Sequence, residues 1–282
     1  MSIVIIFGTR PEYLKIRPLV DELTARGLEH YTIFTSQHKD IVPTSFVPTM
    51  TLPEPVDGSN RLIDLLTQIT HYFGQILTNN KHIQYVLVQG DTTTALAGAI
   101  AAVYSKVKVI HLEAGLRTND FENPYPEEYN RQLISILTDI HLCPTPENEK
   151  NIKENSNYNG KTYVVGNTIL DSLVPFLVDV KSTKTVLVTL HRRENHDMID
   201  KWFTEINRLA KIYDDYDFIL PLHPNPNVQK HRDILTNVRV VEPMEHSDFL
   251  KALVSCRMVI SDSGGIQEEC SFFKKRLLFV VK

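Results

Sequence analysis

The feature that most constrains this chain is a series of short, nearly continuous apolar segments, each followed by a segment with helical periodicity. A strand that is apolar at every position is buried on both faces, which is typical of parallel sheets covered by helices. The alternation predicts a doubly wound α/β fold. In the first half we expect strands at 3–7, 31–34, 85–88, 107–112 and 140–143, with helices that include 17–26 and 92–104.

The same pattern begins again after about residue 184. Its predicted strands are 185–190, 217–222, 238–241, 258–261 and 277–281. We therefore expect a first domain at 1–166, a linker at 167–184 and a second domain at 185–282. Two such units joined by a hinge place a ligand in the cleft between them, at the carboxyl ends of the strands.

The last predicted strand, 277–281, is followed only by Lys282. A doubly wound domain normally continues with a helix that covers such a strand. We therefore expect an incomplete second domain with apolar surface left exposed on this strand, and lower stability and activity than in an extended chain.

Composition excludes several classes of partner. The net charge is -4 and the pI is about 6.3, so no basic excess favours nucleic acid or an anionic membrane. The apolar run at 3–7 is too short for a signal peptide or a membrane span. The three cysteines are odd in number and widely spaced, which argues against a disulfide framework or a metal site and favours a reducing cytoplasm.

The first strand leads directly into a turn and the start of a helix. Gly8 permits a tight turn, and Pro11 suits the first turn of a helix. Arg10 and Lys15 add positive charge where helix-start amides bind anions, which favours a phosphate site. An ordinary turn with two solvated basic residues is the alternative. The absence of a GxGxxG motif disfavours a nicotinamide site.

Carboxylates of the first half lie at two strand ends and at one helix start. Asp91 ends one strand, and its alternative role is to cap the next helix. Glu113 lies just past a buried strand, where an ion pair with Arg117 would also explain it. Glu127 and Glu128 begin a helix, whose dipole favours acidic residues in its first turn. Catalytic and structural interpretations both remain open.

The second half carries a cationic loop and a rigid loop. His191, Arg192 and Arg193 follow a strand and favour a diphosphate site, with a solvated loop as the alternative. The prolines of 223–227 make a rigid loop that turn chemistry alone also explains.

A glycine-rich turn is the strongest single motif of the second half. Ser263, Gly264 and Gly265 follow a strand and open a helix, so their backbone amides can approach a pyrophosphate. Glu269, one turn into that helix, can accept hydrogen bonds from ribose hydroxyls. Together with the cationic loop, this motif favours a nucleotide-sugar site.

In this order the motifs resemble the UDP-N-acetylglucosamine 2-epimerase family, with the non-hydrolysing bacterial type most similar. The resemblance covers essentially the whole chain. It rests on the segments 7–12, 37–38, 90–94, 113–117, 126–128, 166–168, 191–194, 223–227 and 262–269.

The resemblance implies the GT-B architecture, with two Rossmann-like domains around a cleft. It also implies a homodimer, a role in polysaccharide biosynthesis, and no cofactor or metal. Catalytic roles are implied for Asp91, Glu113, Glu127 and His191. Substrate contacts are implied for Arg10, Lys15, Asp91, Glu113, His191, Phe249, Ser263, Gly264, Gly265 and Glu269. An activator site is implied for Gln37, His38, Arg192 and His223.

The chemistry explains why such an enzyme needs several carboxylates. The hydrogen on carbon 2 of the sugar is not acidic until UDP leaves carbon 1. Loss of UDP and of that proton gives a glycal, which is then reprotonated on the opposite face as UDP returns. Asp91 and Glu127 are our choices for proton transfer, Glu113 holds or tunes them, and His191 and Arg10 stabilise the departing UDP.

The chain departs from the family pattern at several positions. It lacks the later Glu-Arg-Pro-Glu motif, whose arginine binds nucleotide, and the closing helices. Met244 replaces a frequent glutamine, Leu190 a glycine, and Asp40 a glutamine that resembles part of the activator site.

Three other functions remain open from the sequence. The chain can be an inactive or weakly active UDP-sugar binder, a hydrolysing 2-epimerase, or a GT-B glycosyltransferase. The sugar can be N-acetylglucosamine or a 6-deoxy relative. Product analysis without an acceptor separates these activities.

Overall fold

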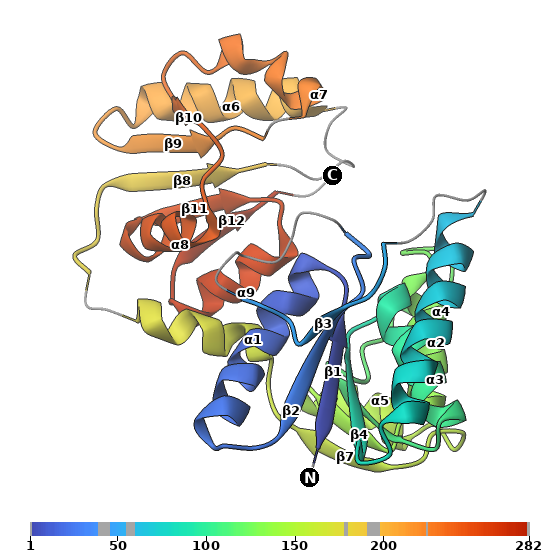
Figure 1. The fold of residues 1–282 in the computed structure, drawn as a ribbon. Coiled ribbons are helices and arrows are strands. Elements are labelled where there is room, and N and C mark those ends of the chain that lie inside the picture. The colour runs from blue at the N-terminus through green and yellow to red at the C-terminus, as the bar shows by residue number, and fades with distance from the viewer. Residues whose placement is uncertain are drawn as a thin grey trace. The chain divides into compact units, whose positions relative to one another are not determined.

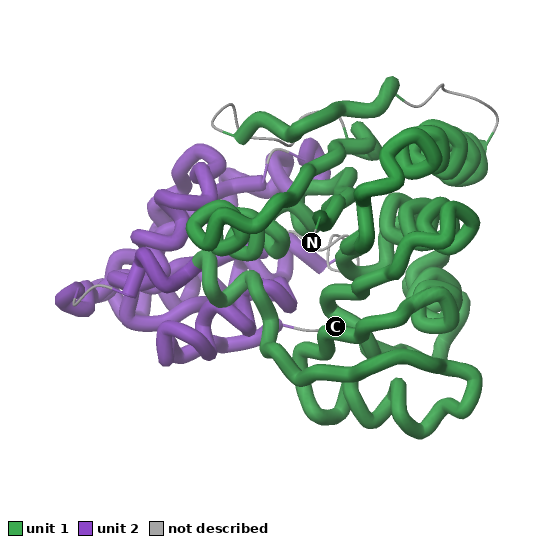
Figure 2. Tube along the Cα trace, turned by 60° about the horizontal axis from the view of Figure 1, so that its bottom comes forward, with its two compact units in different colours: residues 1–172 green, residues 173–282 purple. Residues whose placement is uncertain are grey.

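The computed structural model describes residues 2–38, 46–54, 60–177, 180–190, 198–223 and 225–280. The chain divides into two compact units, unit 1 at residues 1–172 and unit 2 at residues 173–282 (Figure 2). The division falls within the 3-10 helix η1 (Thr168–Phe176). Each unit has a parallel sheet with helices on both faces, so the predicted doubly wound fold is confirmed (Figure 1).

Unit 1 contains a seven-stranded parallel sheet in the order β3-β2-β1-β4-β5-β6-β7. Its strands are β1 (Ile3–Phe7), β2 (His30–Phe34), β3 (Met50–Thr51), β4 (Tyr85–Gln89), β5 (Lys108–Leu112), β6 (Ile140–Cys143) and β7 (Lys161–Val164). The sequence did not predict β3 and β7. Both are edge strands with largely exposed side chains, so neither has the apolar run of a central strand.

Helices cover both faces of this sheet. They are α1 (Arg10–Ala25), α2 (Arg61–Asn79), α3 (Thr93–Tyr104), α4 (Glu127–Leu137) and α5 (Pro146–Lys153). Val4 and Ile6 of β1 belong to a core with α2, α3 and α4, whereas Ile5 and Phe7 belong to a core with α1. Successive strand residues point to opposite faces, so a strand covered on both sides is apolar throughout.

Helix α1 begins at Arg10, as the helix start predicted at 7–12 implies, and seven residues before the range 17–26 that apolar periodicity predicted. Thr9 is its N-cap and forms a capping box with Glu12, in which each side chain binds the other residue's backbone N–H. Pro11 lies in the first turn, where its missing N–H costs nothing. The caps therefore explain a start that the apolar periodicity alone did not locate.

Unit 2 contains a five-stranded parallel sheet in the order β10-β9-β8-β11-β12. Its strands are β8 (Thr185–Thr189), β9 (Asp217–Pro221), β10 (Arg239–Val241), β11 (Met258–Ser261) and β12 (Arg276–Phe279). Helix α6 (Ile199–Ile212) packs on one face, and α8 (His246–Ser255) and α9 (Gly264–Phe272) pack on the other. The short α7 (Pro226–Gln229) and the 3-10 helix η3 (Arg232–Ile234) follow β9.

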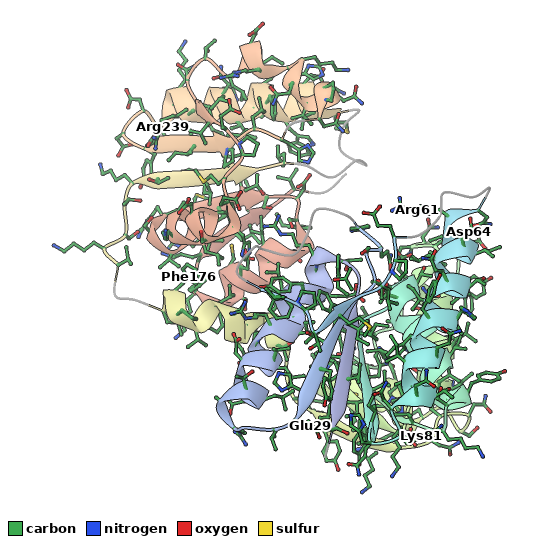
Figure 3. The ribbon with its side chains drawn as sticks, in the orientation of Figure 1. Glu29, Arg61, Asp64, Lys81, Phe176 and Arg239 are labelled. Atoms are coloured by element: carbon green, nitrogen blue, oxygen red, sulfur yellow. The ribbon has the colours of Figure 1, made fainter. Side chains whose placement is uncertain are left out.

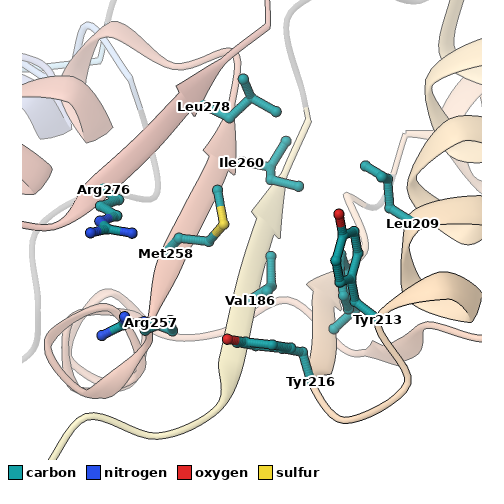
Figure 4. A pocket seen from close by; sticks show the side chains of 10 residues that line it. Val186, Leu209, Tyr213, Tyr216, Arg257, Met258, Ile260, Arg276 and Leu278 are labelled. Carbon is teal, nitrogen blue, oxygen red and sulfur yellow. The ribbon is translucent and has the colours of Figure 1, made fainter.

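An apolar groove of about 350 Å³ lies beside α6 on the sheet of unit 2 (Figure 4). Val186, Ile260 and Leu278 line it from the strands, and Leu209 and Tyr213 line it from α6 and its C-cap. Leu278 of β12 is 50% exposed, which confirms that the last strand leaves an apolar side chain uncovered. Among the described residues, no helix has both the length and the apolar character needed to cross a bilayer.

Candidate active site

A cavity of about 320 Å³ opens at the carboxyl ends of β1, β4 and β5 in unit 1. The sheet order reverses between β1 and β4, and such switch points are the usual ligand sites of doubly wound sheets. Six residues that the sequence singled out line this cavity: Lys15, Gln37, His38, Asp91, Glu113 and Glu127. The fold therefore brings the three predicted catalytic carboxylates of unit 1 to one place.

Glu113 is the most completely paired of the three carboxylates. Lys15 donates to Oε1 at 2.8 Å and to Oε2 at 2.6 Å, and the side-chain amide of Gln89 donates to Oε2. The alternative of an ion pair between Glu113 and Arg117 is wrong, because the Arg117 guanidinium instead donates to the Leu116 carbonyl and to a serine hydroxyl. Glu113 also has a φ of 68°, a left-handed conformation that costs a non-glycine residue energy and is often retained at functional sites.

Asp91 is held by helix α4. Its Oδ2 lies 2.6 Å from an Arg131 guanidinium nitrogen, and its backbone carbonyl accepts from the Asn130 amide at 2.8 Å. The alternative that Asp91 caps α3 is wrong. Thr92 is the N-cap, and its hydroxyl accepts from Ala95 N–H at 3.0 Å. The Asp91 carboxylate is therefore free of a capping role.

Glu127 and Glu128 are neighbours at the start of α4 with different environments. Glu127 lines the cavity, and its buried Oε2 accepts no hydrogen bond from the part of the chain that the structure describes. Glu128 is fully buried and accepts from Thr118, Gln132 and Arg131. Burial opposes its ionisation, but these hydrogen bonds outweigh burial and lower the pKa of Glu128. Glu128 is thus an internal ion-pair residue, more than the first-turn charge that the sequence suggested.

Glu12 is a carboxylate of this cavity that the sequence analysis did not select. Its Oε2 accepts from the backbone N–H groups of Gly8 and Thr9 at 3.0 and 2.7 Å, and its Oε1 accepts from the Thr92 hydroxyl at 2.7 Å. Burial raises the pKa of Glu12 to about 6, against the lowering effect of those hydrogen bonds. The signal in the sequence was the Thr-x-x-Glu capping box.

The loops around the cavity approach one another closely. A Cβ added to Gly8 would lie 2.2 Å from the Thr35 hydroxyl oxygen, so only glycine fits there. The Gln37 amide oxygen accepts from the N–H and hydroxyl of Thr94, and Arg61 donates to the Gln37 carbonyl. Arg61 lies at the start of α2 (Figure 3). Gln37 is therefore fixed at the cavity wall.

His111 supports the loop that carries Asp91. It is 1% exposed and hydrogen bonds through Nε2 to the Gly90 carbonyl at 2.8 Å. A carbonyl only accepts, so Nε2 carries the proton. Burial lowers the pKa of His111 to about 3, and the nearby His141 and Arg117 lower it further against this hydrogen bond. His111 is accordingly a neutral residue that holds the loop.

Unit 2 has its own cavity of about 280 Å³ at the carboxyl ends of β8 and β9. Phe249, Met244 and Ile266 make its wall largely apolar, and Glu269 and His246 add polar groups. Oε1 of Glu269 lies 3.3 Å from the His246 ring, whereas its buried Oε2 accepts no hydrogen bond from the described residues. An apolar wall with one carboxylate oxygen available suits a nucleoside.

The glycine-rich turn lies at the N-terminus of α9, the helix that carries Glu269. Ser263 is the N-cap, and its backbone N–H donates to the Ser261 hydroxyl at 3.0 Å. A Cβ on Gly265 would meet only the Ser263 hydroxyl oxygen, at 3.9 Å. Space is therefore open at the end of a helix whose amides favour an anion.

Of the remaining predicted residues, Arg10 lines neither cavity, His223 lines the cavity of unit 2, and the others lie outside the described residues. Arg10 is exposed at the first residue of α1. His191, Arg192 and Asp40 lie outside the described residues.

Comparisons with known proteins agree with one another. A sequence profile of the family described as UDP-N-acetylglucosamine 2-epimerase matches residues 21–281. A relative from Neisseria meningitidis with that name is 36% identical, and the alignment covers 99% of this chain and 82% of the relative.

Solved structures show the same similarity. The Neisseria meningitidis enzyme bound to UDP-GlcNAc has a TM-score of 0.78 at 34% identity, covering 99% of this chain and 82% of that one. A UDP-GlcNAc 2-epimerase from Methanocaldococcus jannaschii has a TM-score of 0.79 at 28% identity, covering 98% and 83%. The predicted GT-B class, with two Rossmann-like units, is confirmed.

Proposed function

Because the chain belongs to the UDP-N-acetylglucosamine 2-epimerase family, we propose that it interconverts UDP-N-acetylglucosamine and UDP-N-acetylmannosamine through a glycal. Unit 1 is the catalytic unit and unit 2 the nucleotide-binding unit in this proposal. Their separate cavities, one ionic and one largely apolar, support that division.

The observation that carries the proposal is the set of three carboxylates in the cavity of unit 1. Inversion at carbon 2 needs one group to remove a proton and another to deliver one on the opposite face. Asp91 has a carboxylate oxygen without a hydrogen bond from the described residues and Glu127 lines the same cavity, whereas both oxygens of Glu113 are engaged. Asp91 and Glu127 therefore suit proton transfer, and Glu113 suits orientation.

The steps conserve atoms and charge. The bond between carbon 1 and the diphosphate oxygen breaks, and UDP takes the electron pair. A carboxylate takes the proton from carbon 2, and the remaining electrons form the double bond of the glycal. A carboxylic acid then protonates carbon 2 on the other face, and UDP adds back to carbon 1. Which of Asp91 and Glu127 removes the proton depends on the direction of the reaction.

The nucleotide is assigned to unit 2 by the chemistry of its cavity and turn. Glu269 accepts from the ribose hydroxyls in this proposal and Phe249 packs against the nucleoside. The backbone N–H groups of Gly264 and Gly265, together with the Ser263 hydroxyl, bind the diphosphate. Family resemblance adds Arg10 and His191 as groups that stabilise UDP as it leaves.

Gln37 and His38 line the cavity of unit 1 and are candidates for the activator site, with Arg192 and His223. The fixed position of Gln37 between Thr94 and Arg61 supports its use as a binding group. Substitution of Gln37 with alanine is expected to abolish activation by substrate while UDP still binds.

We also propose a homodimer that uses the outer face of α4. Tyr129, Leu133 and Ile136 are 43%, 46% and 54% exposed and lie at i, i+4 and i+7, so they form one apolar stripe. Light scattering should give twice the chain mass for the native protein and a monomer for Leu133→Glu with Ile136→Glu. A monomeric native protein would contradict the proposal.

The activity test uses UDP-N-acetylglucosamine as the only substrate, without a sugar acceptor. We expect a second UDP-N-acetylhexosamine, identified by the coupling of its carbon 2 proton. Free N-acetylmannosamine with UDP would instead assign hydrolysis. An unchanged substrate would contradict the proposed function.

A further inference from the structure

Arg131 joins two carboxylates from one position on α4. Nη2 lies 2.6 Å from Oδ2 of Asp91, and Nη1 lies 3.2 Å from Oε2 of Glu128. Asn130, one residue earlier, donates to the Asp91 carbonyl at 2.8 Å. Helix α4 therefore fixes both the backbone and the carboxylate of Asp91.

Glu128 anchors this arrangement inside unit 1. Its side chain has no exposed surface, and its Oε2 also accepts from the backbone N–H of Thr118 at 2.9 Å and from the Thr118 hydroxyl at 3.1 Å. Gln132 donates to Oε1 at 3.0 Å. An internal charge with this many donors has one stable position, so Glu128 holds Arg131 from the interior of unit 1.

The guanidinium is placed for the two carboxylates and not for its own full set of hydrogen bonds. Nε of Arg131 is buried and has no partner among the described residues. Unpaired buried polar atoms are uncommon and frequently mark functional positions. Arg131 thus contacts Asp91 in a position where its Nε makes no hydrogen bond with the described residues.

The consequence for Asp91 is a distinction between its two oxygens. Arg131 engages Oδ2, and no hydrogen bond from the described residues reaches Oδ1. A carboxylate that exchanges a proton with carbon needs one accessible oxygen in a fixed direction.

We propose that Arg131, anchored by Glu128, is the positioning residue that holds Oδ2 of Asp91 and leaves Oδ1 as the proton-transfer atom. This inference rests on the proposed epimerase function. Glu128 acts only through Arg131, and neither residue contacts the sugar.

Other charged groups also face Asp91 across the cavity. Glu12 and Lys15 come from α1, Glu113 from the loop after β5, Glu127 from α4, and His38 from the loop after β2. Lys15 is engaged by both oxygens of Glu113, so Arg131 is the cation that the described residues place on Asp91.

The test compares Arg131→Lys, Arg131→Gln and the control Arg26→Gln, which removes an exposed arginine paired with Glu22. Lysine keeps the charge but cannot bridge two carboxylates as a fork. We expect kcat for Arg131→Lys to fall about 10- to 100-fold, because small misplacements of catalytic groups cause losses of this size. The KM for UDP-sugar should stay within about threefold of the native value. Arg26→Gln should match the native enzyme.

A pH profile separates positioning from general structural damage. Removal of a cation beside a carboxylate favours its protonated form, so the acidic limb of kcat/KM should move to higher pH in Arg131→Gln. If that variant does not fold, Glu128→Gln combined with Arg131→Gln removes both internal charges and should show the same shift. A kcat within threefold of native for Arg131→Lys, with an unmoved acidic limb, would overturn the proposal.

A crystal structure of Arg131→Lys with UDP gives a readout that does not depend on turnover. We expect the Asp91 carboxylate to rotate away from its native position. An unchanged carboxylate would overturn the positioning role. Failure of the native enzyme to epimerise would refute the proposed function alone.

Discussion

The cavities of the two units are similar in size, about 320 Å³ and 280 Å³, but they differ in the groups that line them. In unit 1, Glu12, Asp91, Glu113 and Glu127 meet Lys15 within a single cavity. In unit 2 the wall is mainly apolar, and Glu269 is its one carboxylate among the described residues. Both cavities lie at the carboxyl ends of parallel strands. The fold therefore determines where each cavity lies, and the residues of the loops determine its chemistry.

The carboxylates of unit 1 also differ from one another. Lys15 and Gln89 engage Glu113, Arg131 engages Asp91 through one oxygen, and Glu127 keeps a buried oxygen without a partner in the described chain. Groups of the same type with different partners can divide the tasks of orientation and proton transfer. Among the described residues, the cavity of unit 2 has the single carboxylate Glu269, which suits a role in nucleotide binding.

The largest expected effect comes from Asp91→Asn and Glu127→Gln. Each preserves shape and removes proton transfer, which is typically worth about 10²- to 10⁴-fold in rate. We expect kcat to fall by at least about 100-fold, with UDP affinity little changed. Steady-state kinetics and calorimetric titration with UDP measure the two quantities.

The control for this pair is Asp21→Asn, an exposed carboxylate on α1 that pairs with Arg17. It should leave kcat unchanged. Because Thr92 and not Asp91 caps α3, a loss of turnover in Asp91→Asn is not a capping effect. Near-native turnover in either main variant would remove that carboxylate from the proposed mechanism.

The second effect is stabilisation by nucleotide. UDP at about 100 times its dissociation constant should raise the free energy of unfolding by roughly 2.7 kcal/mol, whereas free N-acetylglucosamine should not. Thermal melting with each ligand makes the comparison. A melting temperature unmoved by millimolar UDP would contradict the assignment of unit 2 to the nucleotide.

The third effect concerns Glu269. A hydrogen bond to a charged group contributes roughly 1.5–3 kcal/mol, so Glu269→Gln should weaken UDP binding by about 10- to 150-fold. Turnover at saturating substrate should change much less, in contrast with Asp91→Asn. Equal losses in kcat and in UDP affinity would contradict the assignment of catalysis to unit 1 and of nucleotide binding to unit 2.

The smallest effect is a pH dependence of stability that belongs to unit 1. The pKa of His111 is about 3 in the folded protein and about 6.5 when exposed, so the unfolded chain binds the extra proton. Stability is retained above pH 6.5 and lost as the pH falls toward 3, by roughly 2 kcal/mol at pH 5. Urea unfolding of His111→Asn should show a smaller loss between pH 7 and pH 5 than the native protein. Equal losses would show that His111 titrates normally.

The sequence predicted the central strands because burial on both faces leaves a continuous apolar run. It did not predict β3 or β7, because the side chains of these two edge strands are largely exposed and form no continuous apolar run. Apolar spacing located α1 only from residue 17, whereas the turn motif with Pro11 indicated the helix start, which the capping box of Thr9 and Glu12 sets.

The sequence predicted which residues belong to the site but not which residues pair with one another there. Asp91, Glu113 and Glu127 follow predicted strands or begin a helix, so the sequence placed them near one sheet edge. Their partners come from distant segments: Lys15 is 98 residues from Glu113. Local spacing favoured Arg117 for that pair and gave no sign of the pairing between Asp91 and Arg131.

The most direct test of the proposed glycal mechanism follows carbon 2 of UDP-N-acetylglucosamine by proton NMR in deuterated water. Inversion through a glycal exchanges the carbon 2 proton with a carboxylate that has equilibrated with solvent. We expect deuterium at carbon 2 as the two UDP-sugars interconvert, with the proton on carbon 1 retained. Interconversion without deuterium at carbon 2, or no interconversion at all, would contradict that mechanism.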